Sequence, residues 1–249
     1  MILFTKLAYL ETIKMKDILK LISTTLVLFV SLTTIVDNSY AQTEGFNVKT
    51  PIQRISDSTS KFLENLVDES QKNPKESIPQ DLVCSAECFL VIPIVEIIES
   101  RGDFTGTGLL ACRAPNSNKF TEPLFYKINN LESFEEAGGG LVILATDKAG
   151  MKAILRNDVH LNSDNISVGS IGNVGDTGSK PFAAYVKYKD QELSGTDLSG
   201  SVLEYSSKDT FNAYQGTVVP IETLISPQDV PPLLRDFDSL LTDWTKNCK

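Results

Sequence analysis

The residues with the greatest capacity for chemistry in this sequence are its four cysteines and its single histidine, His160. A zinc site needs closely spaced pairs of cysteine or histidine ligands. Cys84 and Cys88 form one such pair, but neither Cys112 nor Cys248 has a neighbour that would complete a second pair. We therefore expect no metal site. In an oxidising compartment the four cysteines would instead form disulfides, and four cysteines allow three pairings.

The other reactive side chains do not follow a catalytic pattern. A Ser–His–Asp hydrolase would have to use His160, and the sequence has no G-x-S-x-G nucleophile elbow. The run Gly138–Gly140 precedes an apolar segment, whereas a dinucleotide fingerprint follows a strand and opens a helix. Glu135 and Glu136 are adjacent, so in a strand they would point to opposite faces. We expect a protein that has no enzymatic activity and uses no cofactor.

The first 41 residues have the organisation of a secretory signal peptide. Met15–Lys20 is short and basic, Leu21–Val36 is apolar and uncharged, and Ser39–Ala41 places small residues before the next segment. The apolar run is shorter than the roughly 20 residues that span a bilayer. A retained membrane anchor is the alternative interpretation, and Met15 is an alternative start of the chain. We expect export to the periplasm or the extracellular space.

The remaining chain is long and acidic. Residues 42–249 suffice for one large domain with a substantial hydrophobic core. The whole chain has a formal net charge of −9, and residues 1–41 carry four lysines against three acidic residues, so the remainder carries −10. This charge disfavours nucleic acid as a partner and disfavours broad attraction to an anionic membrane. A local basic patch or an apolar contact remains compatible with it.

A helix is predicted to begin the folded part, after a polar tail at residues 42–50. Apolar residues recur at helical spacing from Ile52 to Val67, Pro51 lies in the first turn, and Asn73-Pro74 ends the pattern. The apolar stripe of such an amphipathic helix either packs on a core or inserts into a membrane surface. We expect this stripe to pack on the core.

Two apolar strands follow the helix and bring a pair of cysteines together. Cys88–Ile92 is a continuous apolar run, and Phe104–Arg113 is the next strand. Turn residues at 100–103 would connect the two strands as a hairpin. Cys88 and Cys112 would then face each other across the ladder, within the reach of a disulfide. We predict this disulfide, and the other two cysteines are left to pair or to remain free.

The rest of the chain predicts a sheet with few helices. Further strand-like segments lie at 124–128, 141–144, 166–171, 182–188 and 198–203. Short helices are predicted after Asp147 and at 207–214, and Pro231-Pro232 opens a C-terminal helix. This order indicates an α+β fold with a mainly antiparallel, twisted or barrel-like sheet, an N-terminal amphipathic helix, one inserted helix and a C-terminal helix. We assign residues 51–226 to the domain and 227–249 to a C-terminal helix packed on it.

Five motifs of the domain occur in a familiar order. They are an Ile-Pro before a short helix, an apolar strand that ends in proline, a glycine-containing strand that ends in Cys-Arg, a glycine run before a buried strand, and a closing Tyr-x-Gly helix. They occupy residues 78–82, 86–93, 106–113, 138–144 and 212–216. In this order the chain resembles the SYLF lipid-binding domain family, in the form found in bacterial exported proteins. The likeness covers about residues 50–225.

Two segments depart from the pattern of that family. After residues that correspond to Ser133-Phe134, the family commonly has a glutamine and then a Thr-Asp, where this chain has the shorter segment Glu135–Gly140. The family's usual Gly-Leu-Phe-Ala-Gly is replaced by Gln191–Gly195. Polar residues thus stand in place of aromatic and apolar ones. If either segment contacts a ligand, binding would be altered or lost.

The resemblance implies a lipid-binding role, with phosphoinositides as ligands of eukaryotic members and the lipid contact on an amphipathic N-terminal helix. The corresponding residues here are Lys49, Arg54, Lys61, Phe62 and Leu63. We therefore expect a non-catalytic binding protein that engages a membrane lipid or another apolar ligand. The alternative is a structural or protein-interaction module of the cell envelope that uses a sheet face or a strand edge. The sequence does not identify a protein partner.

Overall fold

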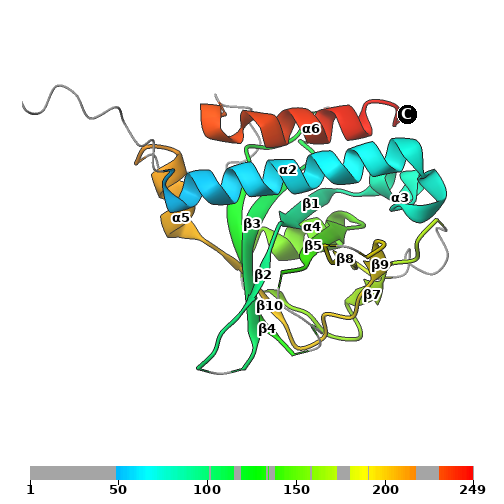
Figure 1. The fold of residues 1–249 in the computed structure, drawn as a ribbon, viewed down its shortest axis with the longest axis horizontal. Helices are drawn as coiled ribbons and strands as arrows, with labels where there is room; N and C mark the ends of the chain where they lie inside the picture. The colour runs from blue at the N-terminus through cyan, green and yellow to red at the C-terminus, as the bar shows by residue number, and fades with distance from the viewer. Residues whose placement is uncertain are drawn as a thin grey trace, which may run out of the picture. The chain divides into compact units, whose positions relative to one another are not determined.

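The computed structural model describes residues 49–100, 102–114, 119–132, 134, 138–157, 159–172, 180–189, 191–216 and 230–248. The predicted signal segment 1–41, most of the polar tail and Glu135–Ala137 lie outside the described residues. The described residues belong to one unit, which begins at Lys49. In this unit, two long helices run side by side over one face of a curled sheet, as Figure 1 shows.

The first of these helices, α2 (Pro51–Lys72), begins and ends where its sequence predicts. The Thr50 hydroxyl accepts a hydrogen bond from the Gln53 backbone N–H, and the Gln53 side chain accepts one from the Thr50 N–H. This reciprocal pair is a capping box, and it satisfies two backbone donors that a helix otherwise leaves unpaired. The apolar stripe of α2 packs on the sheet, with Leu63 fully buried.

The sheet contains ten strands and confirms the predicted α+β class. The strands are β1 (Cys88–Ile92), β2 (Val95–Ile97), β3 (Phe104–Cys112), β4 (Leu124–Leu131), β5 (Gly140–Ala145), β6 (Val159–His160), β7 (Ile166–Val168), β8 (Phe182–Lys187), β9 (Ser194–Gly195) and β10 (Val202–Tyr205). Their order is β6-β10-β4-β3-β1-β5-β8-β7, with β2 beside β3 and β9 beside β8. Every pair is antiparallel except β7 with β8.

The two edge strands of this order, β6 and β7, follow each other directly in the chain. Only residues 161–165 separate them, so the sheet must curl to bring its edges together. The Asn165 side-chain amide donates to the His160 carbonyl at 2.8 Å, and the Lys180 ammonium donates to the Ile166 carbonyl at 3.2 Å. Side chains thus occupy carbonyl groups on both edges, which limits pairing with another chain.

Alternation along the strands divides the core into two layers. In β1, Phe89 and Val91 face the covering helices, whereas Leu90 and Ile92 face the inside of the curl. The helical layer consists of α2, α3 (Gln80–Ser85), α5 (Ser207–Ala213) and α6 (Arg235–Thr245). The inner layer is filled by strand residues and by α4 (Lys148–Ile154), whose Asp147 cap was predicted.

Two disulfides stabilise this arrangement. Cys88 is bonded to Cys112, the pairing that the hairpin register predicts, and the two residues are direct partners in the β1–β3 ladder. Cys84 is bonded to Cys248, a pairing that the sequence leaves open, and this bond ties α3 to the end of α6. Disulfides persist in oxidising environments, such as those that exported proteins meet.

One arginine completes the end of α3. The Arg113 guanidinium donates hydrogen bonds to the carbonyl oxygens of Ala86 at 2.7 Å, Val83 at 3.1 Å and Cys84 at 3.2 Å. The last carbonyls of a helix have no partner within the helix, so a cation at this place satisfies and stabilises them. The Phe120 ring lies 5.4 Å from the guanidinium carbon.

The structure differs from the prediction near residue 200. A strand is expected at 198–203, but β10 begins only at Val202. Gly200 has φ of +92°, a backbone conformation that belongs to a turn and not to a strand. The short strands β6 and β9 are also not predicted, because two residues are too few to carry a recognisable alternation.

Candidate ligand-binding groove along helix α2

A groove of three joined hollows follows one flank of α2, and we call it the α2 groove. Residues of α2 that line it recur three or four positions apart, as one flank of a helix requires. They are Pro51, Arg54, Ile55, Ser58, Phe62, Asn65, Asp68, Glu69 and Lys72, and Asn73 and Glu76 continue the row beyond the helix. Pro93 is common to the first and middle hollows, and Glu69, Lys187 and Gln191 are common to the middle and third. The three hollows therefore adjoin one another along α2.

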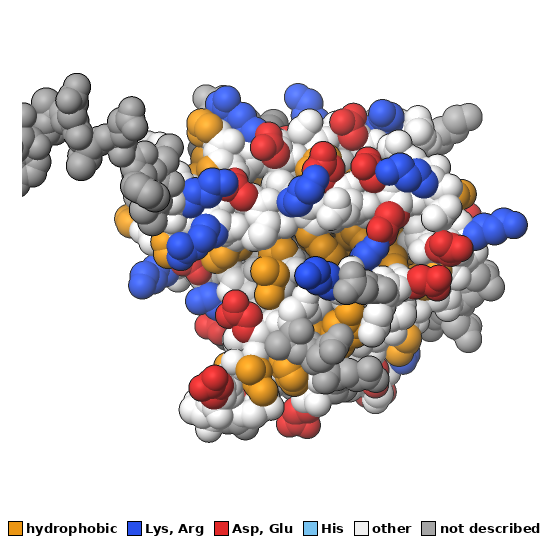
Figure 2. Space-filling view, viewed as in Figure 1, with side chains coloured by type: hydrophobic (Ala, Val, Ile, Leu, Met, Phe, Trp, Pro, Cys, Tyr) orange, Lys and Arg blue, Asp and Glu red, His pale blue; other side chains and the backbone are white. Residues whose placement is uncertain are grey.

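The first hollow lies at the N-terminal end of α2 and has a volume of about 420 Å³. Its second wall comes from the β2–β3 ribbon, where Pro93 breaks the strand and leaves Ile94 at the surface. Ile94 is 46% exposed and offers apolar surface to this hollow. Figure 2 shows hydrophobic side chains gathered in a band below α2, between the helix and the strands.

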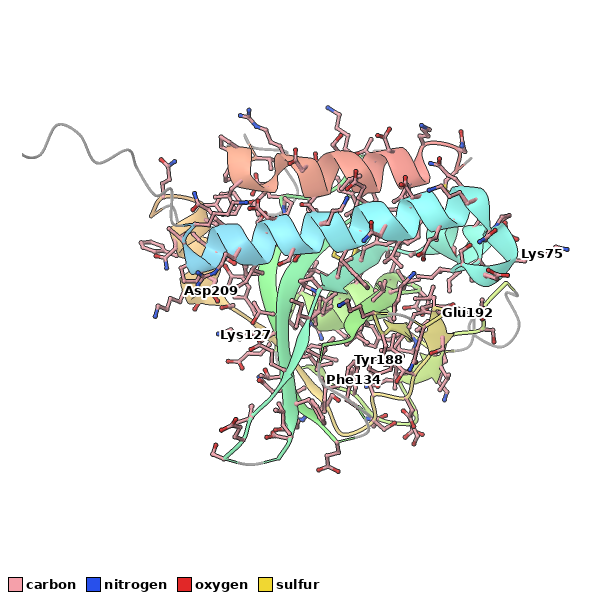
Figure 3. All side chains as sticks on the ribbon, in the orientation of Figure 1. Lys75, Lys127, Phe134, Tyr188, Glu192 and Asp209 are labelled. Atoms are coloured by element: carbon pink, nitrogen blue, oxygen red, sulfur yellow. A yellow bond between two sulfur atoms is a disulfide. The ribbon has the colours of Figure 1, made fainter. Side chains whose placement is uncertain are left out.

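The middle hollow, of about 560 Å³, is the largest of the three. Its floor depends on Gly140, because a side chain at this position would overlap the ring of Phe62. Phe134 and Tyr188 lie next to each other beneath it (Figure 3), with ring centroids 5.5 Å apart. The volumes of the first and middle hollows fall within the range of about 300–1,000 Å³ that small-ligand sites occupy.

The third hollow is smaller, about 240 Å³, and more polar. Glu192 lies at this end of the groove, toward α3 (Figure 3). Lys187 and Glu69 form an ion pair across the boundary between the middle and third hollows. The groove thus changes from apolar at the N-terminal end of α2 to charged at the C-terminal end.

The structure separates the five residues that the family resemblance suggests. Phe62 lines the middle hollow and Arg54 lines the first. Lys61 is exposed on the other flank of α2, 2.7 Å from Glu64, and that hydrogen bond raises the pKa of the Lys61 ammonium. Lys49 precedes the helix and pairs with Asp57 at 2.5 Å. Leu63 is fully buried, so it belongs to the core and not to a surface that a ligand reaches.

Groups with shifted pKa values lie elsewhere in the fold. Burial raises the pKa of Tyr126, Tyr185 and Tyr214, and the hydroxyls of Tyr126 and Tyr214 donate to backbone carbonyls at 2.9 Å. His160 is exposed on β6. Among the described residues there is no group of three or more histidine, cysteine or acidic side chains placed to hold a metal ion.

Comparison with known proteins adds no assignment. No family model matches the sequence. No curated protein matches it either. Within the described residues, no helix is both long and apolar enough to cross a bilayer.

The wall opposite α2 comes from the two segments that depart from the SYLF pattern. Gly138 and Gly140 line the middle hollow, and residues 191–193 line the middle and third hollows. Sequence reasoning places the implied lipid contact on the helix and singles out both segments as altered, but it does not predict that they form the wall opposite the helix. The available signals were the glycine run, which leaves room for Phe62, and Pro93, which lies between β1 and β2 and interrupts their pairing with β3.

Proposed function

We propose that this chain is an exported, non-catalytic binding protein of SYLF type that engages a membrane lipid or another apolar ligand through the α2 groove. The observation that carries the proposal is the row of adjoining hollows beside α2, of which the first two combine apolar side chains with enough volume for a ligand. Two disulfides support a place in the periplasm or outside the cell.

The apolar side chains that line the groove support a binding role. Phe62, Pro93 and Ile94 offer apolar contact, and the amount of such surface largely sets the affinity for a hydrocarbon. The alternative, an interaction module that adds a strand to an edge of the sheet, receives less support. Asn165 bonds one carbonyl group on β6 and Lys180 bonds one on β7, the two strands that end the main order of the sheet.

Vesicle co-sedimentation tests the proposal. The protein would be produced with its signal segment, purified after export, and mixed with vesicles of phosphatidylcholine alone or with phosphatidylglycerol. We expect wild-type protein to sediment with vesicles or to release bound lipid that mass spectrometry detects after extraction. Replacing Ile94 with aspartate should weaken binding at least tenfold, because a charge would enter the apolar wall.

Val168→Asp is the matched control for that variant. Val168 lies on β7, is 52% exposed, and does not line any of the three hollows. It should bind as the wild type does. If neither vesicles nor extracted lipid associate with the wild-type protein, the proposed function is wrong. If Ile94→Asp and Val168→Asp bind equally well, a lipid binds somewhere other than the groove.

A further inference from the structure

Among the described residues that line the middle hollow of the α2 groove, lysines outnumber acidic side chains by one. Its two acidic side chains each pair with a lysine: Lys187 binds Glu69, and the Lys72 ammonium lies 3.8 Å from the Asp68 carboxylate. Lys189 lines the same hollow, is exposed, and makes no ion pair with any residue that the structure describes. In a chain with a net charge of −9, this lysine is a local point of attraction for one anion.

The two ends of the groove do not attract an anion. In the first hollow, Arg54 and Glu96 offset each other. In the third hollow, Lys187 is outnumbered by glutamates, which include Glu76 and Glu192. An anionic group of a ligand would therefore be repelled at the third hollow and attracted at the middle hollow. At the first hollow the two opposite charges nearly cancel, so the group would be neither attracted nor repelled.

Apolar surface continues from the middle hollow in one direction only. It runs from Phe62 past Pro93 to Ile94 and Ile55 in the first hollow. The third hollow has Leu193 as its sole apolar lining residue among those the structure describes. A ligand with its anionic group at Lys189 would therefore place its hydrocarbon toward the N-terminal end of α2.

The length of this path suits a single lipid chain. Ile55 and Glu69 are fourteen residues apart on α2, which corresponds to about 21 Å at the rise of an α-helix. One leaflet of a bilayer, with its head groups, is about 20–22 Å thick. An extended amphiphile as long as one membrane lipid would thus reach from the charged middle hollow to the end of the apolar surface.

From the charge and the length together, and resting on the proposed binding function, we infer that the α2 groove holds one long-chain fatty acid, with its carboxylate at Lys189 and its chain along Phe62, Pro93 and Ile94. One lysine without an ion pair among the described residues matches a monovalent carboxylate, whereas a multiply charged phosphate head group would meet Asp68 and Glu69 with no further cation among the described lining residues. The ligand is carried in the groove, away from any bilayer.

Displacement of a fluorescent fatty-acid analogue measures this binding. The competitors are laurate, palmitate and monolaurin, which has the laurate chain on a neutral head group. We expect one site per protein and tighter binding of palmitate than of laurate, by up to about tenfold for every two methylenes. Laurate should bind about tenfold more tightly than monolaurin, and high salt should reduce that preference.

Two charge variants locate the carboxylate. Lys189→Glu should weaken laurate about tenfold or more and leave monolaurin unchanged, whereas Lys152→Glu, an exposed lysine on α4, should change neither. If laurate and monolaurin bind equally in both variants and in the wild type, the assignment of Lys189 is overturned while the binding function stands. If vesicles bind and none of the three competitors does, the protein recognises a membrane surface and the fatty-acid inference fails. If vesicles and competitors all fail to bind, the proposed function fails with it.

Discussion

At the scale of single residues, the position of Arg113 requires one side chain that can bond several acceptors at once. Its guanidinium reaches three carbonyl oxygens at the end of α3, and burial lowers its pKa relative to an exposed arginine. Arginine retains its proton there because its pKa in water is above 12. Several donors fixed in one plane allow it to bond three acceptors at once, which the single ammonium of lysine cannot do with the same geometry.

Arg113→Lys should therefore lower the free energy of unfolding by about 2 kcal/mol, since partly buried carbonyl oxygens would lose charged donors. Guanidinium chloride unfolding followed by circular dichroism measures this loss. Arg235→Lys is the control, because Arg235 is exposed and its side chain makes one hydrogen bond within the described residues, to the Val230 carbonyl at 3.2 Å. It should change stability by no more than about 0.5 kcal/mol. Equal losses in the two variants would contradict the role of Arg113.

At the scale of elements, α6 depends on three kinds of attachment. Phe237, Leu241 and Trp244 bury its apolar face against the sheet and α2. The Ser56 hydroxyl of α2 donates a hydrogen bond to the Leu233 carbonyl, just before α6 begins. The Cys84–Cys248 disulfide fixes the other end. Because Cys84 and Cys248 are half-buried and Cys88 and Cys112 are buried, a reductant reaches the α6 attachment first.

Mild reduction with a phosphine should release the end of α6 before it affects the sheet. We expect hydrogen exchange at α6 amides to accelerate while amides of β1 and β3 stay protected. The Cys84→Ser/Cys248→Ser double variant should behave like the mildly reduced protein. Cys84–Cys248 closes a span of 164 residues and Cys88–Cys112 one of 24, so chain entropy assigns about 1.7 kcal/mol more to the former. Simultaneous loss of protection in α6 and β1 would contradict this order.

At the scale of the whole molecule, two buried tyrosines make the stability of the folded state depend on pH. Tyr126 lies in the inner layer and Tyr185 in the layer under the helices, and burial raises the pKa of both hydroxyls. A raised pKa means that the folded state holds the phenol proton more tightly than the unfolded state does. The resulting stability is complete below the unfolded pKa of about 10 and is lost as the pH rises further.

The midpoint of guanidinium chloride unfolding should therefore stay constant from pH 8 to about 9.5 and fall between about pH 10 and 11.5. Absorbance at 295 nm should show that Tyr126 and Tyr185 ionise together with unfolding and not before it. The Tyr126→Phe variant should lose less stability over the same interval. Ionisation of all tyrosines in a protein that keeps its circular dichroism signal would show that these hydroxyls are accessible.

Local signals in the sequence predicted the elements well. Helix α2 has a capping residue, a first-turn proline and a periodic apolar stripe, and each acts within a few residues. The Cys88–Cys112 pair followed from one hairpin. The prediction placed β10 too early, because the left-handed backbone at Gly200 extends the turn before the strand.

The α2 groove could not be predicted in the same way. Its walls come from α2, from the ribbon after Pro93, from the Gly138–Gly140 run and from residues 187–193. These segments meet only because the sheet curls, and no local pattern encodes that curl. The family resemblance implied Leu63 as a lipid contact, but Leu63 belongs to the apolar stripe of α2 and is fully buried in the core.

The Cys84–Cys248 bond also has a consequence for biosynthesis. A chain made from its N-terminus presents Cys84, Cys88 and Cys112 long before Cys248, which follows Cys84 by 164 residues. During that interval the β1–β3 ladder places Cys112 opposite Cys88, and the Cys84 thiol has no native partner. A product truncated before Cys248 would leave the Cys84 thiol without this partner, and thiol-dependent quality control could recognise it. The Cys84–Cys248 disulfide can thus form only after synthesis has passed the C-terminal helix α6.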